Sequence, residues 1–234
     1  MITLTRYILF IIIGIVPLNC QQNKTGIHEL QSLYYKNRKA PLLEKLTVLN
    51  GIDVLLEKKL HFIQSRKIAL VTNHSGIDRN GIPNYKRLME TDSVELKVIF
   101  SPEHGLFGEA ADGQKINYHK LKELPKVVSP YGGTRKPTAE MLSGVNLIIY
   151  DIQDIGARFY TYITTLGLVM EAGAELNIPV LVLDRPNPIR ADIIEGPLLD
   201  LKYRSFVGHY PIPIRYGSTV GELAESIIEN KWVD

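Results

Sequence analysis

The sequence is poor in cysteine and in net charge, and each shortage excludes a class of protein. One cysteine in 234 residues cannot form an internal disulfide, so the chain is not one of the small folds that disulfides hold together. A formal net charge of +2, from 27 basic and 25 acidic residues, does not indicate nucleic-acid binding. Hydrophobic residues make up 45% of the chain, which predicts an ordinary globular protein with a substantial core.

Several motifs that identify enzyme classes are also absent from the sequence. No G-x-G-x-x-G follows the first expected strand, which argues against a dinucleotide-binding fold, and there is no Walker A motif, no H-E-x-x-H and no G-x-S-x-G. We therefore expect neither a cofactor nor a metal ion, because the six histidines also lack the spacing of metal ligands: His28, His61, His74, His104, His119 and His209.

The first twenty residues are typical of an export signal. Arg6 precedes an apolar run over residues 7–18, which is too short to cross a bilayer, since a spanning helix needs about 20 residues. Cys20 follows at once and resembles the lipidated cysteine of a bacterial lipoprotein, which would hold the chain at a membrane. We expect an exported lipoprotein, periplasmic or facing the outer membrane. The alternative is an ordinary signal peptide, cleaved nearby, with Cys20 incidental.

The rest of the chain divides into a polar tether over residues 21–47 and a compact domain over residues 48–234. Within the domain, apolar strand-like runs alternate with segments of helical spacing. Strands are expected over residues 68–72, 94–100, 127–128, 147–151 and 180–183, and helices over residues 52–60, 85–90, 138–142 and 164–176, with a last helix from a capping box at residues 219–222 through residue 232. This alternation predicts an α/β fold, a parallel sheet with helices on both faces.

Four of the expected strands end in clusters of polar residues. The clusters cover residues 72–76, 101–105, 151–156 and 184–188. Open α/β sheets bind ligands outside the carboxyl ends of their strands. If the four strands are parallel neighbours, the clusters converge on one cleft, and the sequence predicts an active site there.

The cluster at residues 101–105 offers a general acid or base. Pro102 fixes the backbone, so Glu103 and His104 follow on a rigid turn. In the next cluster, Asp151 and Gln153 share one side of an extended chain, and Asp154 lies near the turn at Gly156. Carboxylates near Glu103 would raise its pKa, which suits an acid catalyst. The alternatives are local: Glu103 as an exposed loop acid, His104 packed beside it, and one aspartate capping the next helix.

Further candidates carry cationic, aromatic or amide groups. Tyr160 and Tyr162 present aromatic faces that suit sugar rings, although aromatic residues at this spacing more often pack against a core. Arg158 and Arg135 are able to bind a carboxylate with two hydrogen bonds. Proline-containing turns carry the remaining candidates: Asp184, Asn187 and Glu195.

Longer motifs link these clusters to a known family. Pro-Glu-His-Gly stands at residues 102–105, and Asp-Ile-Gln-Asp-Ile-Gly-Ala-Arg-Phe-Tyr-Thr-Tyr stands at residues 151–162. Further matching segments occur in order at residues 71–73, 131–132, 134–138, 183–188, 195–197, 205–208 and 219–224. Over about residues 51–234 the sequence closely resembles the exo-β-N-acetylmuramidase family (NamZ-type), long described as a domain of unknown function.

The resemblance implies a glycoside hydrolase that removes terminal N-acetylmuramic acid (MurNAc) from the non-reducing end of β-1,4-linked peptidoglycan saccharides. It implies a Rossmann-like N-terminal domain, a smaller C-terminal domain and a cleft between them. Glycoside hydrolysis needs an acid, for which Glu103 is the candidate. The second group is left open between Asp151, Asp154, Glu195 and the acetamido group of the substrate.

The resemblance also suggests how the substrate is held. Arg158 or Arg135 would bind the lactyl carboxylate of muramic acid. Asn73, Asp184 and Asn187 would bind sugar hydroxyls, beside His104, Gln153, Tyr160, Tyr162 and Glu195.

The sequence departs from the family pattern in two places. The chain stops at Asp234, just after the last expected helix, so we expect a domain truncated at its C-terminal end. Tyr-Gly-Ser stands at residues 216–218, where His-Gly-Met is commoner in the family. Two rival functions stay open: a non-catalytic lipoprotein module that binds cell-wall sugars, and an unrelated hydrolase or transferase that uses the same cleft.

Overall fold

The computed structural model of the 234-residue chain describes residues 48–102, 105–108, 124–129 and 135–233. Those from Asn50 onward belong to one compact unit. The expected export signal with Cys20, the expected tether and the site candidates Glu103 and His104 lie outside the described residues. No helix among the residues described is long and apolar enough to cross a membrane.

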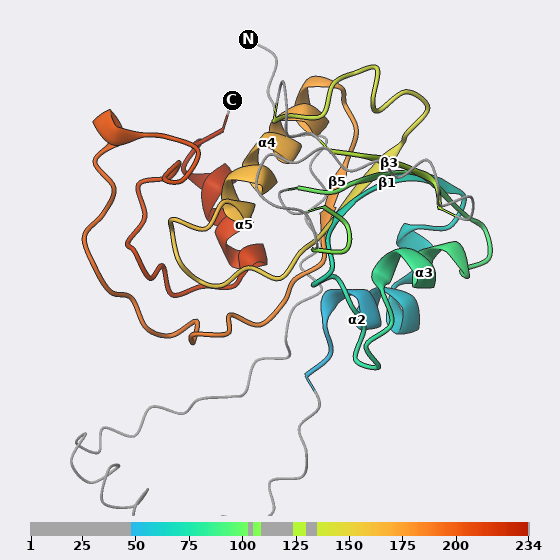
Figure 1. The fold of residues 1–234 in the computed structure, drawn as a ribbon, viewed down its shortest axis with the longest axis horizontal. Coiled ribbons are helices and arrows are strands. Elements are labelled where there is room, and N and C mark those ends of the chain that lie inside the picture. The colour runs from blue at the N-terminus through green and yellow to red at the C-terminus, as the bar shows by residue number, and fades with distance from the viewer. Residues whose placement is uncertain (1–47, 103–104, 109–123, 130–134, 234) are drawn as a thin grey trace, which may run out of the picture. The chain divides into compact units, whose positions relative to one another are not determined.

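A five-stranded parallel sheet forms the centre of the fold, in the order β3-β2-β1-β4-β5 (Figure 1). The strands are β1 (Arg66–Thr72), β2 (Val94–Phe100), β3 (Lys126–Val128), β4 (Leu147–Asp151) and β5 (Val180–Val182). Leu70 lies opposite Ile99 on one side and Ile149 on the other. The central strands are nearly continuous apolar runs because both faces of a parallel sheet are buried. The strands predicted from these runs are confirmed.

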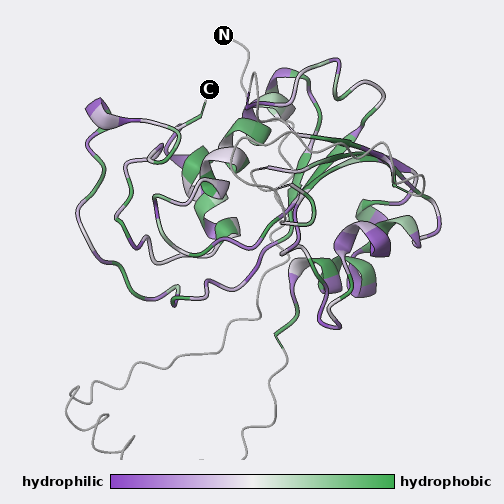
Figure 2. Ribbon diagram, viewed as in Figure 1, coloured by the Kyte–Doolittle hydropathy of each residue, from purple (hydrophilic) through white to green (hydrophobic). Residues whose placement is uncertain are grey.

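Helices cover both faces of the sheet. Alternate side chains of β1 and β4 enter two cores, which α/β folds of this kind require. Leu70 and Ile149 pack with α2 (Gly51–Lys58) and α3 (Asn84–Met89). Val71 and Tyr150 pack with α4 (Tyr162–Glu175) and α5 (Val220–Glu229). Figure 2 shows apolar strands between helices of mixed polarity, so the predicted α/β fold is confirmed.

The prediction of a helix over residues 138–142 is wrong. The chain makes only turns there: the amide of Leu142 donates to the carbonyl of Thr138 (3.0 Å) and that of Ser143 to Glu140 (3.3 Å). One turn of helix is too short to be stable by itself.

Two other helices end earlier than expected. Helix α2 ends at Lys58, and a short 3₁₀ helix (Leu60–Phe62) follows it. Helix α5 begins at the predicted capping box, in which the Thr219 hydroxyl accepts from the Glu222 amide, and it ends at Glu229. The chain leaves the helix at Lys231, whose φ of 54° is left-handed.

The order of the strands reverses between β1 and β4. Strands β2 and β3 extend the sheet on one side of β1, and β5 extends it on the other side of β4. A ligand crevice in such a sheet opens beyond the carboxyl ends of the two strands at the reversal. After β5 a long connection with only one short 3₁₀ helix (Leu201–Tyr203) leads to α5, and it runs on the α4 and α5 side of the molecule (Figure 1).

Candidate functional site

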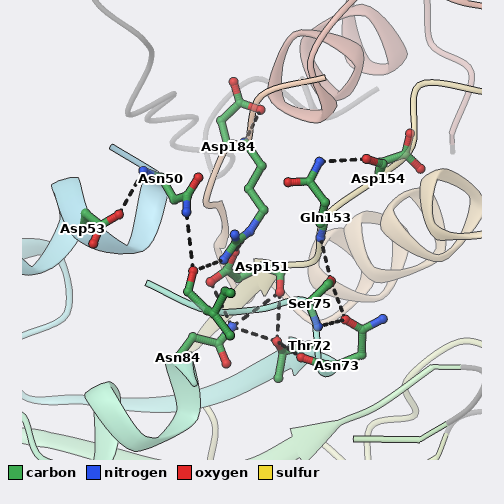
Figure 3. A network of polar contacts seen from close by, with 12 residues as sticks. Asn50, Asp53, Thr72, Asn73, Ser75, Asn84, Asp151, Gln153, Asp154 and Asp184 are labelled. Carbon is green, nitrogen blue, oxygen red and sulfur yellow. Dashed lines mark hydrogen bonds and ion pairs between the residues drawn. The ribbon is translucent and has the colours of Figure 1, made fainter. Parts of the chain in front are cut away.

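The carboxyl ends of β1 and β4 are joined by a buried polar network (Figure 3). The Thr72 hydroxyl donates to the backbone carbonyl of Asp151 (2.9 Å). The side-chain amide of Asn84, at the start of α3, donates to the Thr72 hydroxyl (2.7 Å) and to Oδ2 of Asp151 (2.8 Å). Both strand ends and α3 are therefore held together at the strand reversal. Sequence reasoning missed Asn84, since no motif marks it.

A buried ion pair completes this network. Nε of Arg185 lies 2.6 Å from Oδ1 of Asp151, and the two side chains are 3% and 0% exposed. Nη2 of Arg185 donates to the carbonyl of Ile77 (2.9 Å), in the loop after β1. Both carboxylate oxygens of Asp151, a candidate for the second catalytic group, are thus engaged by protein groups.

Asp184 joins the end of β5 to helix α5. Its Oδ2 accepts from the Thr219 hydroxyl (2.7 Å), and its Oδ1 accepts from the Gly221 amide (2.8 Å) and the Arg185 amide (2.9 Å). Burial raises the pKa of Asp184, and these hydrogen bonds oppose that shift. We expected Asp184 to bind sugar hydroxyls. In this structure its two oxygens instead accept hydrogen bonds at the N-terminus of α5.

Asn73, predicted to bind substrate, bridges the loops after β1 and β4. Its Nδ2 donates to the hydroxyl of Tyr162 (2.7 Å), and its Oδ1 accepts from the hydroxyl of Ser75 (2.6 Å). The Ser75 hydroxyl in turn accepts from the backbone amide of Gln153 (3.1 Å). The ring of Tyr160 stands edge-on to that of Tyr162, with centroids 4.7 Å apart. The structure therefore brings these four predicted residues together.

Gln153 and Asn187 connect the loop after β4 to the chain beyond β5. Nε2 of Gln153 donates to the carbonyls of Asp154 (2.7 Å) and Pro186 (2.9 Å). Nδ2 of Asn187 donates to the Ser218 carbonyl (2.8 Å). Gly156 has a φ of +79°, and a Cβ there would come within 2.3 Å of Oδ1 of Asn187, so this contact requires glycine.

Asp154 differs from the other two aspartates of the site. It is 4% exposed, and its Oδ2 accepts from the Gly156 amide (2.7 Å) and from the Tyr216 hydroxyl. Its Oδ1 has no hydrogen-bond partner within the part of the chain that the structure describes. Burial raises the pKa of Asp154, although both hydrogen bonds to Oδ2 act to lower it. Asp154 is thus a buried carboxyl group with a raised pKa, and its Oδ1 is enclosed by the protein without a hydrogen-bond partner among the described residues.

Two other candidates, Arg158 and Glu195, contact the long connection after β5. Nη1 of Arg158 donates to the carbonyls of Pro197 (2.7 Å) and Ile212 (2.6 Å), so this guanidinium fixes backbone. Glu195 is exposed and pairs with Arg215 at 2.8 Å.

Arg135 lies nearer the N-terminus of α4. Its guanidinium stands 4.3 Å from the ring centre of Phe206. The Phe206 carbonyl accepts from the hydroxyl of Thr164 (2.9 Å), in the first turn of α4. Since α4 follows the loop after β4, this contact brings Arg135 to the carboxyl edge of the sheet.

The described residues that flank positions 103 and 104 lie at the same edge. Ser101 directly follows β2, the neighbour of β1, and its amide donates to the carbonyl of Val128 (3.0 Å). Gly108 has a φ of +72°, and a Cβ there would come within 2.6 Å of Nδ1 of His74, in the loop after β1. The polar clusters after β1, β2, β4 and β5 therefore share one edge. Among the described residues, no group of three or more His, Cys, Asp and Glu is arranged to hold a metal ion.

The sequence from position 68 to position 234 matches a family model described as exo-beta-N-acetylmuramidase NamZ, N-terminal. The chain belongs to this family. A NamZ-family relative from Bacillus subtilis strain 168, named peptidoglycan beta-N-acetylmuramidase NamZ, is 45% identical over 182 residues, which are 77% of this chain and 44% of the relative.

Two solved structures of DUF1343 family proteins from Bacteroides fragilis NCTC 9343 have the same fold. They are 41% and 34% identical to this chain, with TM-scores of 0.72 and 0.68. Each match covers 80% of this chain and 47% or 48% of the solved chain. This chain therefore spans about half the length of these relatives. The two structural matches confirm the predicted Rossmann-like fold.

Replacing Arg185 with Met should destabilise the protein strongly. The change leaves the Asp151 carboxylate buried without its cation, a loss that costs about 3–5 kcal/mol of the free energy of unfolding. Urea denaturation followed by circular dichroism measures this cost. Arg190→Met is the matched control, because Arg190 pairs with Asp192 on the surface, and it should leave the midpoint unchanged. Equal midpoints for the two variants would contradict the role given to the buried pair.

Replacing Asp154 with Asn should change how stability depends on pH. The raised pKa means that the folded protein binds the Asp154 proton more tightly than the unfolded chain does. This contribution to stability is therefore present below about pH 4, the ordinary pKa of an aspartate, and is lost as the pH rises through the folded pKa. The stability of the native protein relative to Asp154→Asn should fall across that range and level off above it. Parallel curves from denaturation at a series of pH values would refute the shift.

Proposed function

We propose that this chain carries the catalytic groups of an exo-β-N-acetylmuramidase, which removes terminal β-1,4-linked MurNAc from the non-reducing end of peptidoglycan fragments. The observation that carries the proposal is the polar site at the strand reversal of a NamZ-family fold. The name of the 45% identical Bacillus subtilis relative supports the substrate class. No cofactor enters this proposal.

Glu103 is the proposed general acid. It follows β2, whose neighbour β1 ends beside the buried network, and the chain before it is fixed by Pro102. A glycosidase acid protonates the oxygen of the leaving sugar while positive charge develops at the anomeric carbon. Its place in the sequence, directly after Pro102 and the carboxyl end of β2, supports this role.

For the second group, the contacts favour Asp154 over Asp151 and Glu195. Asp151 has both oxygens engaged by Arg185 and Asn84, and Glu195 pairs with Arg215 in solvent. Asp154 has one oxygen without a hydrogen-bond partner in the described ranges, and because that oxygen is buried, a substrate would reach it only after a local opening of the site. The acetamido group of the substrate stays as the alternative, as in glycosidases whose substrate supplies the nucleophile.

Arg135 is the proposed partner of the lactyl carboxylate that distinguishes muramic acid from glucosamine. The guanidinium of Arg158 is already bound to two backbone carbonyls. Arg135 instead lies over the Phe206 ring, and the structure gives it no carboxylate partner among the residues it describes. A stacked guanidinium keeps its edge donors available for a bidentate contact with a carboxylate.

We further propose that lipidation of Cys20 holds the enzyme at a membrane outside the cytoplasm. The support is the signal-like sequence over residues 1–20. A surface-held exo-enzyme would act on saccharides released from the cell wall.

Glu103→Gln should lower the rate of hydrolysis of the disaccharide MurNAc-GlcNAc by about 10²–10⁴-fold. Release of nitrophenol from para-nitrophenyl β-MurNAc should fall less, because nitrophenolate leaves without protonation. Initial rates on both substrates, with the purified chain from Gln21 onward, measure the difference. Glu95→Gln is the control, since Glu95 is exposed near the amino end of the same strand.

Equal losses on both substrates would assign Glu103 to nucleophilic attack instead of acid catalysis. Normal turnover by Glu103→Gln would refute its role. If the folded native chain releases no sugar yet binds MurNAc in calorimetry, the rival function, a binding module without catalysis, is the correct one.

Arg135→Ala should raise KM for MurNAc substrates about tenfold, because the carboxylate loses a charged hydrogen bond of about 1.5–3 kcal/mol. The same variant should leave KM unchanged for para-nitrophenyl β-N-acetylglucosaminide, which lacks the lactyl group, if the native enzyme cleaves it. If the native enzyme does not cleave that substrate, the inhibition constants of the free sugars MurNAc and N-acetylglucosamine provide the same comparison. A loss shared by both sugars, or a loss equal to that of the surface variant Arg190→Ala, would rule out the carboxylate contact.

A further inference from the structure

The chain from the end of α2 to the start of β1 carries positive charge that no acidic neighbour compensates. Residues 58–67, which we call the basic segment, contain no aspartate or glutamate and four strong cations: Lys58, Lys59, Arg66 and Lys67. All four are exposed, and none forms an ion pair with another described residue. Surface cations elsewhere have carboxylate partners, as Lys202 has in Asp200 at 2.8 Å. The basic segment is therefore a concentration of free positive charge.

The basic segment lies at the edge of the sheet opposite the candidate site. Arg66 is the first residue of β1 and lies opposite Val94, the first residue of β2, and all strands of a parallel sheet begin at the same edge. The amide of Ser65 donates to the carbonyl of Ser93 (2.7 Å), and the amide of Arg66 donates to the carbonyl of Ile63 (3.1 Å). The charges therefore stand on a fixed backbone, one strand length away from the polar network.

Acidic side chains at this amino edge do not cancel the charge. Asp92 and Glu95 stand at the start of β2, and Glu95 already pairs with Lys97 at 3.2 Å. Strand β3 begins with a further exposed cation, Lys126. The residues just before β4 and β5, 144–146 and 177–179, are uncharged. Cations thus outnumber acids along the whole described part of the amino edge.

A hollow beside the basic segment adds apolar surface to the positive charge. Its volume is about 120 Å³, and it lies between the 3₁₀ helix at Leu60–Phe62 and the starts of β4 and β5. His61 and Arg66 form part of its lining, and the other lining residues are apolar: Phe62, Leu147, Pro179, Val180 and Leu181. Cations beside apolar side chains suit an amphiphile, which has an anionic head and hydrocarbon chains, better than a wholly hydrophilic polyanion.

We propose that the amino edge of the sheet binds the surface of an anionic phospholipid bilayer through the basic segment. Lipid phosphates attract lysine and arginine side chains that lie within a few ångströms of them, and apolar groups at the interface add to the binding. The domain would then present its carboxyl edge, with the candidate site, on the side away from the lipid. This inference concerns orientation and does not depend on the reaction proposed above.

The length of chain before the domain permits this orientation. The first helix begins at the carboxyl edge, where the amide of Gly51 donates to the carbonyl of Asp184 (2.8 Å). Residues 21–47 would span at most ~90 Å if fully extended. A domain of this size is about 40 Å across. A lipid anchor at Cys20 and the basic segment at the opposite edge are therefore able to contact the same bilayer.

The test measures co-sedimentation of the chain from Gln21 onward, which retains every described residue and lacks Cys20, with lipid vesicles. The chain should bind vesicles of equal parts phosphatidylglycerol and phosphatidylethanolamine, and should not bind neutral phosphatidylcholine vesicles. Raising sodium chloride from about 50 to about 500 mM should release it, because salt screens exposed charges.

The triple variant Lys58→Gln, Lys59→Gln, Lys67→Gln should lower the partition coefficient on the order of a hundredfold, since each lysine near an anionic surface contributes about fivefold. The matched control removes three exposed lysines from other parts of the domain: Lys86→Gln, Lys202→Gln, Lys231→Gln. It has the same net charge and should change the coefficient less than threefold. Unchanged thermal midpoints, followed by circular dichroism, establish that both variants are folded.

Three results would overturn the proposal. The first is absence of binding to the anionic vesicles at low salt. The second is an equal loss in the two triple variants, which would show that net charge acts without a defined surface. The third is complete release by inorganic polyphosphate at a phosphate concentration equal to that of the lipid, which would make the amino edge a site for a soluble polyanion.

Discussion

The carboxyl edge of this sheet depends on the buried ion pair between Asp151 and Arg185. Neither charge reaches water, so each needs the other, and removing one partner from such a pair costs far more than removing a surface pair. The pair joins β4 to the chain after β5, and the same guanidinium reaches the loop after β1 through the carbonyl of Ile77. A single side chain thus fixes three strand ends relative to one another.

Most polar residues of the candidate site hold the protein together instead of facing a ligand. Four of them form hydrogen bonds with neighbouring segments or with the start of α5: Asn73, Gln153, Asp184 and Asn187. A network whose members are satisfied is rigid, and a rigid edge keeps catalytic groups in position without reorganisation. Asp154 is the exception, because its buried Oδ1 has no hydrogen-bond partner among the described residues.

The sequence predicted the strands and the capping box because those depend on neighbours along the chain. The apolar run before Asp151 and the Thr219–Glu222 spacing are local signals, and both are confirmed. The pairing of Asp151 with Arg185 and of Asp184 with Thr219 depends on the order of strands, so it was out of reach. The helix prediction over residues 138–142 failed because this segment has a helical composition but too few residues to form a stable helix.

Hydrogen bonds also join the candidate site to the long connection after β5. Arg158 belongs to the loop after β4 yet donates to the carbonyls of Pro197 and Ile212, on the outgoing and returning parts of that connection, and Asn187 ties the chain after β5 to Ser218, just before α5. The loop after β4, which carries Gln153 and Asp154, is therefore held from the side of α5 as well as from β1. Groups fixed in this way from several elements need no reorganisation at the moment of reaction, and electrostatic stabilisation of a transition state depends on that preorganisation.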